Sequence, residues 1–349
     1  MKMSFRWYGP DDPVILQQIR QIPGMKHIVS AVYDVPVGQV WNEESIVALQ
    51  KQCEENGLLF DLVESVPVHE DIKLGLPTRE KYIENYCENI RRLARHGVKC
   101  ICYNFMPIFD WTRTDVHHKM EDGAENLIYD TKALAQMDPL TGELSLPGWD
   151  SSYRKEDLRR LFSQYAQRSK EDLWENLRDF LQKVIPVAEE NDVKMAIHPD
   201  DPPWDIFGLP RLITDEAAID RFLSLYDSPY NGLTFCTGSL GCSKKNNIVK
   251  MAEKYSAMGR IHFVHLRNVK WNEDGGFEES GHLTAQGSLD MAAIVGALKK
   301  TGFSGYIRPD HGRMIWGETG RPGYGLYDRA LGAVYLNGLW EAIDRENKK

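Results

Sequence analysis

Short apolar runs alternate with helical patterns along nearly the whole chain, and this alternation restricts the fold most. Apolar or β-branched runs lie at 27–36, 58–67, 98–105, 193–199, 233–238, 261–268 and 306–312, with a weaker one at 4–9. Between them, apolar residues recur at three- and four-residue spacing, as in amphipathic helices. Parallel strands need crossover helices, and closure of the sheet removes its edges. Eight such units therefore predict a single α/β domain, a (β/α)8 TIM barrel.

The length of 349 residues suits either one large barrel or two average domains. A doubly wound open sheet is the structural alternative, but no G-x-G-x-x-G follows the first strand, so its dinucleotide-binding form has no support. We therefore expect one domain over residues 1–349.

The alternation is interrupted after the fourth strand, between residues 106 and 171. This segment is rich in Asp, Gly, Tyr and Trp and is too long for an ordinary connection. We expect it to form a lid over the barrel mouth; the alternative is an insertion that serves only contacts between subunits. A second irregular stretch, 271–287, follows the seventh strand and is expected to close the other side.

The charge balance and the cysteine content exclude several classes of protein. Lys and Arg number 42 against 51 Asp and Glu, and the net charge of −9 repels a phosphate backbone, so we expect no nucleic-acid partner. No signal-peptide pattern opens the chain, and no run approaches the ~20 apolar residues of a membrane span, so we expect a cytoplasmic protein without a membrane partner. The six cysteines are sparse and irregularly spaced, which argues against a disulfide framework.

Four successive strands end in polar side chains that suit a metal ion. Active sites of barrels lie at the C-terminal ends of the strands, and alternation along each strand places one donor per strand on the inward face. Two imidazoles, a thiolate and a carboxylate on rigid elements are what a divalent metal requires. The predicted ligands are His198, Cys236, His265 and Asp310.

Each of these residues also has a simpler interpretation on its own. A single histidine at a strand end can be a satisfied polar residue, and Cys236 alone can be a small buried hydrophobic side chain. Cys100 and Cys102 form C-x-C on the fourth strand, where alternation predicts packing inside the barrel or outward against helices, so neither is assigned to a metal. The metal hypothesis rests on the joint occurrence at four strand ends.

At these residues the sequence resembles the mannonate dehydratase family of hexuronate (glucuronate) catabolism, which is metal-dependent and belongs to the xylose-isomerase-like barrels. The resemblance runs through MSFRWYGPDDPV, WDSSYR, MAIHPDDPPW, FVHLRN and RPDHG. It implies a hydro-lyase that converts D-mannonate to 2-keto-3-deoxy-D-gluconate, the same four metal ligands, and a homodimer or higher oligomer. The metal it implies is Mn²⁺, although a thiolate with two imidazoles suits Fe²⁺ or Zn²⁺ at least as well. We expect Mn²⁺ first, Fe²⁺ second and Zn²⁺ last.

This reaction removes a proton from C2 and hydroxide from C3, so it needs a base and an acid. A metal at the substrate carboxylate or an adjacent hydroxyl would stabilise the charge that develops. We expect His311, next to a predicted ligand, and Tyr324, in the glycine-rich stretch beyond, to form this pair. Which of the two takes the proton stays open, Asp200 competes as a base, and Tyr324 has the alternative of packing on Trp316.

An anionic substrate needs local positive charge in an acidic protein. Arg267 and Arg308, at the ends of the last two strands, are expected to bind its carboxylate, since guanidinium groups suit bidentate contacts; either could instead neutralise Asp310 or a nearby carboxylate. Asn104 is expected to hydrogen-bond a sugar hydroxyl, with Glu64 the weaker candidate.

Two other functions remain as alternatives. A metal-dependent sugar isomerase or epimerase uses the same fold, but such enzymes are typically richer in carboxylate ligands. A non-catalytic sugar-acid binding protein with a degraded barrel site is the other alternative, and the completeness of the ligand set argues against it.

Overall fold

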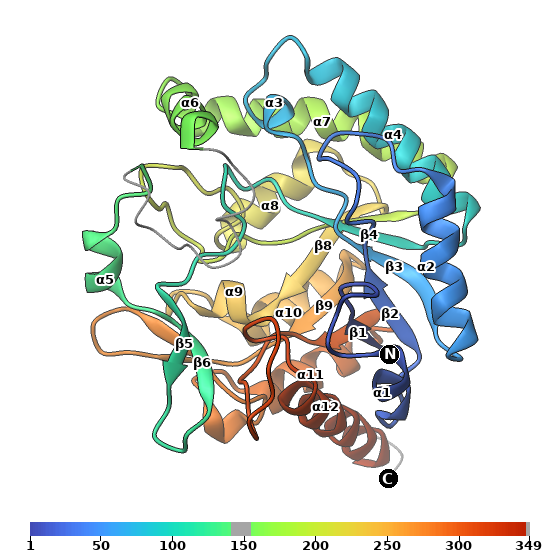
Figure 1. The fold of residues 1–349 in the computed structure, drawn as a ribbon, viewed down its shortest axis with the longest axis vertical. Coiled ribbons are helices and arrows are strands. Elements are labelled where there is room, and N and C mark those ends of the chain that lie inside the picture. Colours follow the sequence, from blue (N-terminus) through green and yellow to red (C-terminus); the bar gives the residue numbers. More distant parts are fainter. Residues whose placement is uncertain (141–154, 347–349) are drawn as a thin grey trace.

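Eight parallel strands close into a barrel at the centre of the molecule (Figure 1). The structure is a computed structural model that describes residues 1–140 and 155–346. The order around the ring is β1-β12-β9-β8-β7-β4-β3-β2, which confirms the predicted (β/α)8 barrel. The barrel strands are β1 (Lys2–Arg6), β2 (His27–Ser30), β3 (Leu59–Glu64), β4 (Cys100–Tyr103), β7 (Lys194–Ile197), β8 (Asn231–Cys236), β9 (Ile261–Leu266) and β12 (Tyr306–Pro309).

Helices surround the barrel, and several of them begin at side chains that cap the helix. Asn42 caps one helix by accepting a hydrogen bond from the backbone N–H of Ser45, and Ser169 forms a capping box with Asp172 at the start of another. No helix within the described part of the chain is long and apolar enough to cross a membrane. The surrounding helices are α1 (Leu16–Gln21), α2 (Glu43–Glu55), α3 (Glu70–Lys73), α4 (Arg79–Arg95), α7 (Lys170–Glu190), α8 (Glu216–Leu225), α9 (Thr237–Gly241), α10 (Ile248–Ala257), α11 (Met291–Lys300) and α12 (Tyr327–Glu346).

Two separate groups of side chains make the core. The larger one packs between strands and helices, whereas a smaller cluster joins side chains from β2, β3, β4, β7, β9 and β12. Since strands from all around the ring contribute to it, this smaller cluster is the interior of the barrel. Cys100 and Cys102 belong to it, so of their two expected positions they occupy the inner one.

The two irregular stretches of the sequence form one antiparallel sheet. The segment after β4 folds into β5 (Asp115–Lys119) and β6 (Glu125–Tyr129), and the stretch after β9 folds into β10 (Val269–Trp271) and β11 (Phe277–Glu279). Their order is β10-β11-β6-β5, and the pairing of β11 with β6 brings together segments far apart in the sequence (Figure 1). We call this four-stranded sheet the mouth sheet.

The rest of the predicted insertion is also ordered where the structure describes it. It contains α5 (Thr131–Gln136) and α6 (Lys155–Tyr165), whereas irregular chain was expected. Strands of three to five residues are too short to show a period, and their partners are chosen only when the barrel brings the two hairpins together. The WDSSYR motif lies outside the described residues.

Candidate metal centre

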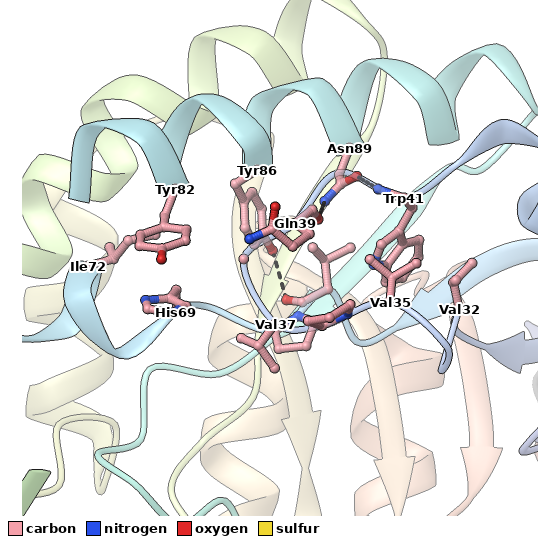
Figure 2. Close-up of a pocket in the computed structure, with 14 residues that line it drawn as sticks. Val32, Val35, Val37, Gln39, Trp41, His69, Ile72, Tyr82, Tyr86 and Asn89 are labelled. Atoms are coloured by element: carbon pink, nitrogen blue, oxygen red, sulfur yellow. Dashed lines mark hydrogen bonds between the residues drawn. The ribbon is translucent and has the colours of Figure 1, made fainter. Parts of the chain in front are cut away.

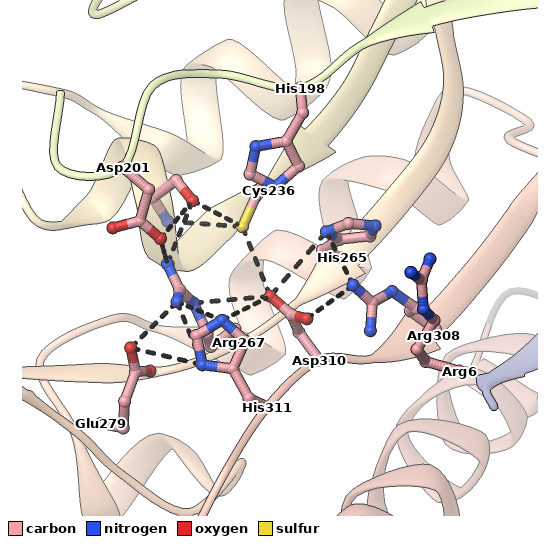
Figure 3. Close-up of polar contacts among 12 residues, drawn as sticks. Arg6, His198, Asp201, Cys236, His265, Arg267, Glu279, Arg308, Asp310 and His311 are labelled. Carbon is pink, nitrogen blue, oxygen red and sulfur yellow. Dashed lines mark hydrogen bonds and ion pairs between the residues drawn. The ribbon is translucent and has the colours of Figure 1, made fainter. Parts of the chain in front are cut away.

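Side chains from the ends of three neighbouring strands converge at the barrel mouth (Figure 3). His198 follows β7, Cys236 ends β8 and His265 lies near the end of β9; one potential ligand atom from each lies within 4.8 Å of the other two. Asp310, directly after β12, joins them, with its Oδ2 3.7 Å from the Cys236 Sγ and 3.8 Å from the His265 Nδ1. The structure thus brings together all four predicted metal ligands.

The spacing of these atoms suits a metal ion. Bonds of about 2.0–2.3 Å to a tetrahedral ion place neighbouring ligand atoms roughly 3.3–3.8 Å apart. The separations from Asp310 to Cys236 and His265 agree with that range. The His198 Nδ1 lies 2.7 Å from the backbone oxygen of Pro199, a contact that orients the ring and leaves its other nitrogen to coordinate a metal.

Local charges keep the cysteine in its metal-binding form. Burial by itself would raise the pKa of the Cys236 thiol, but the charge of Arg267 and hydrogen bonds from His198 and His265 lower it to about 5. The backbone N–H and the hydroxyl of Ser239, in α9, donate to the sulfur at 3.4 and 3.0 Å. Cys236 is therefore a thiolate near neutral pH, and the thiolate is the form that binds metals.

Arg308 lies against Asp310 on the other side of the centre. Its Nη2 is 2.8 Å from the Asp310 Oδ1 and 3.0 Å from the Glu64 Oε1. Burial would raise the pKa of Asp310, but the neighbouring positive charges, Arg308 first, hold it well below its usual range. These contacts support one of the two roles expected for Arg308, the neutralisation of Asp310.

Arg267 is held in a buried group of alternating charges. Its guanidinium donates to Asp201 at 2.7 Å and to Glu279 at 2.9 Å. Arg113, from the insertion, donates to the same two carboxylates at 2.8 and 3.1 Å. Arg267 therefore forms ion pairs with carboxylates from the mouth sheet and from the loop after β7. These contacts agree with the alternative raised from the sequence, in which Arg267 neutralises a nearby carboxylate. Sequence reasoning missed three members of this group: Arg113, Asp201 and Glu279.

His311 and Tyr324 lie together beside the metal ligands. Their ring centroids are 5.3 Å apart, and the His311 Nε2 is 3.6 Å from the Asp310 Oδ2. Arg267 donates to that same Nε2 at 2.8 Å. Tyr324 does not pack on Trp316, the alternative raised from the sequence, because Trp316 instead lies against Tyr327 at 5.5 Å between ring centroids.

Asp200, the competing base predicted from the sequence, lies outside this arrangement and is held by its own loop. Its Oδ2 accepts hydrogen bonds from the backbone N–H groups of Leu212 and Ile213 at 3.0 and 2.6 Å, and its Oδ1 lies 3.5 Å from Arg211. Strand β7 ends at Ile197, so strand alternation no longer decides where side chains point beyond it. The aspartate that faces the site is its neighbour in the sequence.

Asn104 is bound within its own loop. Its Nδ2 donates to Asp110 at 2.9 Å, and its Oδ1 accepts from the backbone N–H of Met106 at 3.2 Å. Both ends of the amide are therefore occupied by the chain segment that follows β4. These contacts hold the loop and do not join Asn104 to the metal ligands.

Glu64, the weaker candidate from the sequence, contacts both His265 and Arg308. Its Oε2 is 3.2 Å from the His265 Nε2, and a second possible ligand group consists of Glu64, Cys102 and His265. Burial raises the pKa of the Cys102 thiol well above its usual value, and Arg308 already pairs with Glu64. The set around Cys236, which is a thiolate, is the better metal site.

A separate hollow lies between the loops after β2 and β3 and helix α4 (Figure 2). Two of its polar side chains bond within its wall: the hydroxyl of Tyr86 donates to the Val66 backbone oxygen at 3.3 Å, and Asn89 accepts from the Trp41 backbone N–H at 2.7 Å. The remaining lining is largely apolar. This hollow therefore offers less chemistry than the barrel mouth.

Comparisons with known proteins agree along the full chain. A family profile described as D-mannonate dehydratase (UxuA) matches residues 1–349. Mannonate dehydratase 2 of Halalkalibacterium halodurans is 57% identical over 343 residues, covering 98% of this chain and 99% of that protein. The mannonate dehydratase of Streptococcus uberis is 56% identical over 348 residues and covers 100% of both chains.

Solved structures extend the same comparison to the fold. The crystal structure of mannonate dehydratase from Streptococcus suis serotype 2 superposes with a TM-score of 0.94 at 51% identity, covering 100% of this chain and 96% of that one. A xylose isomerase domain protein from Planctomyces limnophilus has a TM-score of 0.58 at 12% identity, with 99% of each chain covered, and shares the fold alone.

Proposed function

Because this chain belongs to the D-mannonate dehydratase family, its reaction is the dehydration of D-mannonate, and we propose that the barrel mouth carries it out. The observation that supports this placement is the convergence of three donors within 4.8 Å of one another, one of them a thiolate, with Asp310 adjoining two of them. The proposed metal ligands are His198, Cys236, His265 and Asp310.

The family is metal-dependent, and we propose Mn²⁺ as the ion, with Fe²⁺ second and Zn²⁺ third. The donor set by itself does not separate these ions, because two imidazoles and a thiolate suit Fe²⁺ and Zn²⁺ as well. When bound, the ion supplies a Lewis acid for the substrate carboxylate or its neighbouring hydroxyl.

The dehydration breaks the C2–H and C3–O bonds. The C2 proton passes to a base, the C3 hydroxyl leaves as water after receiving a proton, and the resulting enol becomes the C2 ketone. We assign the base to His311: burial holds its pKa well below the usual value, so the ring is neutral, and its Nε2 can accept a proton when the 2.8 Å contact from Arg267 is released. We assign the acid to Tyr324, because burial raises the pKa of its hydroxyl well above 10, which keeps it protonated.

The remaining polar residues have proposed roles in binding and positioning. Arg308 is the proposed contact for the substrate carboxylate. Arg267 holds the ring of His311 through the 2.8 Å contact to its Nε2 and lies 3.6 Å from Asp310, so its proposed role is to position both rather than to bind substrate directly. Asn104 remains the proposed contact for a substrate hydroxyl, because its Nδ2 carries a second N–H besides the one that it donates to Asp110.

We propose that the insertion at 106–171 acts as a lid. Trp111 lies with its ring 5.9 Å from that of His311, and Arg113 completes the charge group around Arg267, so the insertion supplies part of the wall of the site. A covered site excludes water from the reacting atoms. We also propose a homodimer or higher oligomer, which analytical ultracentrifugation would test.

The proposal is tested by reconstitution with metal. Protein stripped with a chelator and then loaded with Mn²⁺, Fe²⁺ or Zn²⁺ is incubated with D-mannonate, and the 2-keto-3-deoxy acid is measured. We expect product only from the loaded protein, and most with Mn²⁺. D-Gluconate, the C2 epimer, serves as the comparison substrate. Absence of metal-dependent product from folded protein would refute the proposed site.

A further inference from the structure

Two buried arginines from neighbouring strands lie side by side next to the candidate metal centre (Figure 3). Arg6 ends β1 and Arg308 lies in β12, the strand that pairs with β1. Their side chains are 9% and 1% exposed. Arg6 was not singled out from the sequence, because it ends the strand with the weakest pattern.

These guanidinium groups have more donors than the protein has acceptors for them. Arg308 uses its Nη2 for Asp310 and Glu64, and the Arg6 Nη1 lies 3.7 Å from the same Glu64, too far for a hydrogen bond. The Nε and Nη1 atoms of both arginines are buried and have no hydrogen-bond partner among the residues that the structure describes. Charged donors buried without an acceptor are costly, so their presence at a functional site requires an explanation.

The charge balance around Arg6 and Arg308 also indicates a place for an anion. Arg308 pairs closely with both Glu64 and Asp310, whereas the only carboxylate that pairs with Arg6 among the described residues is Glu64, at 3.7 Å, which Arg308 already holds. The charge of Arg6 is therefore only loosely balanced within the part of the chain that the structure describes. Guanidinium groups present paired donors in a plane, a geometry that matches a carboxylate.

Aromatic rings hold Arg6 in position. Its guanidinium carbon is 4.8 Å from the centre of the Tyr8 ring, and that ring meets Tyr324, the proposed acid, edge-on at 5.1 Å. The unpaired donors are therefore next to the proposed acid as well as next to a proposed metal ligand. An anion bound there would be in reach of the proposed reacting groups.

We propose that Arg6 and Arg308 together bind the carboxylate of the substrate, an inference that rests on the proposed site for dehydration. The pair selects sugar acids over neutral sugars, because a neutral sugar leaves the buried donors unpaired. Neutralising the carboxylate also makes the adjacent C2 proton easier to remove. Arg6 is thus a substrate-binding residue from the opposite end of the chain to Arg308.

Arg6→Gln and Arg6→Lys test the proposal, with Arg321→Gln as the matched control. Arg321 also lies over the Tyr8 ring, at 4.1 Å, but it is exposed. We expect Arg6→Gln to raise the KM for D-mannonate about ten- to a hundred-fold, as loss of charged hydrogen bonds does. Arg6→Lys keeps the charge but not the paired donors, so its KM should lie between those of the wild type and of Arg6→Gln. Arg321→Gln should resemble the wild type.

Two further measurements separate binding of the carboxylate from general damage. Metal content should be unchanged in every variant, and inhibition by D-mannitol, which lacks the carboxylate, should be equally strong in the wild type and in Arg6→Gln. A KM within two-fold of the wild type, or a parallel loss of mannitol inhibition, would overturn the proposal. If Arg6→Gln does not fold, the KM of Arg6→Lys decides. Wild-type protein that fails to convert D-mannonate refutes the proposed function instead.

Discussion

Cys236 differs from the other five cysteines in the protonation state of its side chain. Burial raises the pKa of Cys87 to about 11 and of Cys53 to about 12, and it raises that of Cys242 well above its usual value. Cys236 is equally buried, but Arg267 and two imidazoles lower its pKa to about 5. The residue type is the same throughout, so the chemistry is decided by the neighbouring charges.

Replacement of cysteines should show this difference directly. Cys236→Ala removes the thiolate, so we expect the purified protein to hold far less than one metal ion per chain. Cys242 is also buried and lies six positions away, and its thiol donates to the Gly238 backbone oxygen at 3.1 Å. Cys242→Ala should therefore keep its metal. Elemental analysis checks both; equal metal content in the two variants would contradict the ligand set.

The acid and base can be tested one at a time. His311→Asn and Tyr324→Phe each remove a proton-transfer group, so we expect kcat to fall by roughly 10²–10⁴-fold. The metal content should remain that of the wild type, since neither residue is a proposed ligand. Steady-state kinetics with elemental analysis measures both quantities. Near-normal turnover in either variant would exclude that residue from the mechanism.

At the scale of elements, each barrel strand presents one face to the site and the other to the helices. On β9, His265 faces the metal ligands, while His262 is buried on the other side, where an added Cβ at Gly232 would lie 2.3 Å from its Nε2. Burial lowers the pKa of His262 to about 3. One strand thus carries a proposed ligand and a histidine that the fold keeps neutral.

The neutral His262 makes folding stability depend on pH. The pKa of His262 is 6.5 in the unfolded chain and about 3 in the folded chain. Its neutral form therefore contributes fully to folding stability above pH 6.5, and this contribution is lost as the pH falls below 6.5. At pH 5 the loss is about 2 kcal/mol. Between pH 7 and pH 5, the free energy of unfolding should therefore fall by about 2 kcal/mol less in His262→Gln than in the wild type. Urea unfolding at both pH values measures this, and equal losses would contradict it.

At the scale of the whole molecule, a buried charge group joins the mouth sheet to the barrel. Arg113 and Glu279 come from the segments that form the sheet, whereas Asp201 and Arg267 follow barrel strands. Their side chains are at most 2% exposed. Such a group stabilises the closed arrangement only while all its members are present, because an unpaired buried charge is strongly unfavourable.

Removal of one cation should therefore be costly. Arg113→Met leaves Asp201 and Glu279 sharing only Arg267, and we expect unfolding free energy to fall by about 3–5 kcal/mol. Arg178, whose ion pair with Glu175 is exposed on α7, is the matched control, and Arg178→Met should change stability by less than about 1 kcal/mol. Urea unfolding compares the two. Similar small effects in both would show that the buried group does not hold the sheet.

The barrel, and the side chains that meet at its strand ends, could be predicted from the sequence because both depend on local patterns. Alternation with period 2 in strands and 3.6 in helices is visible within a few residues, and it placed Cys236 and His265 on the inner face of adjacent strands. Predicted strand ends were less accurate: the run at 27–36 contains only His27–Ser30 as strand, because the apolar residues continue into the loop at the mouth.

Only the tertiary structure decided which carboxylates and cations meet at the site. Asp200 and Asp201 are adjacent in the sequence, yet the first turns to its own loop and the second to Arg267, since alternation ends with the strand. Arg6 and Arg308 lie at opposite ends of the chain and meet only because the barrel closes β1 onto β12. Local periodicity determines which residues lie at strand ends, whereas closure of the ring determines which of them become neighbours.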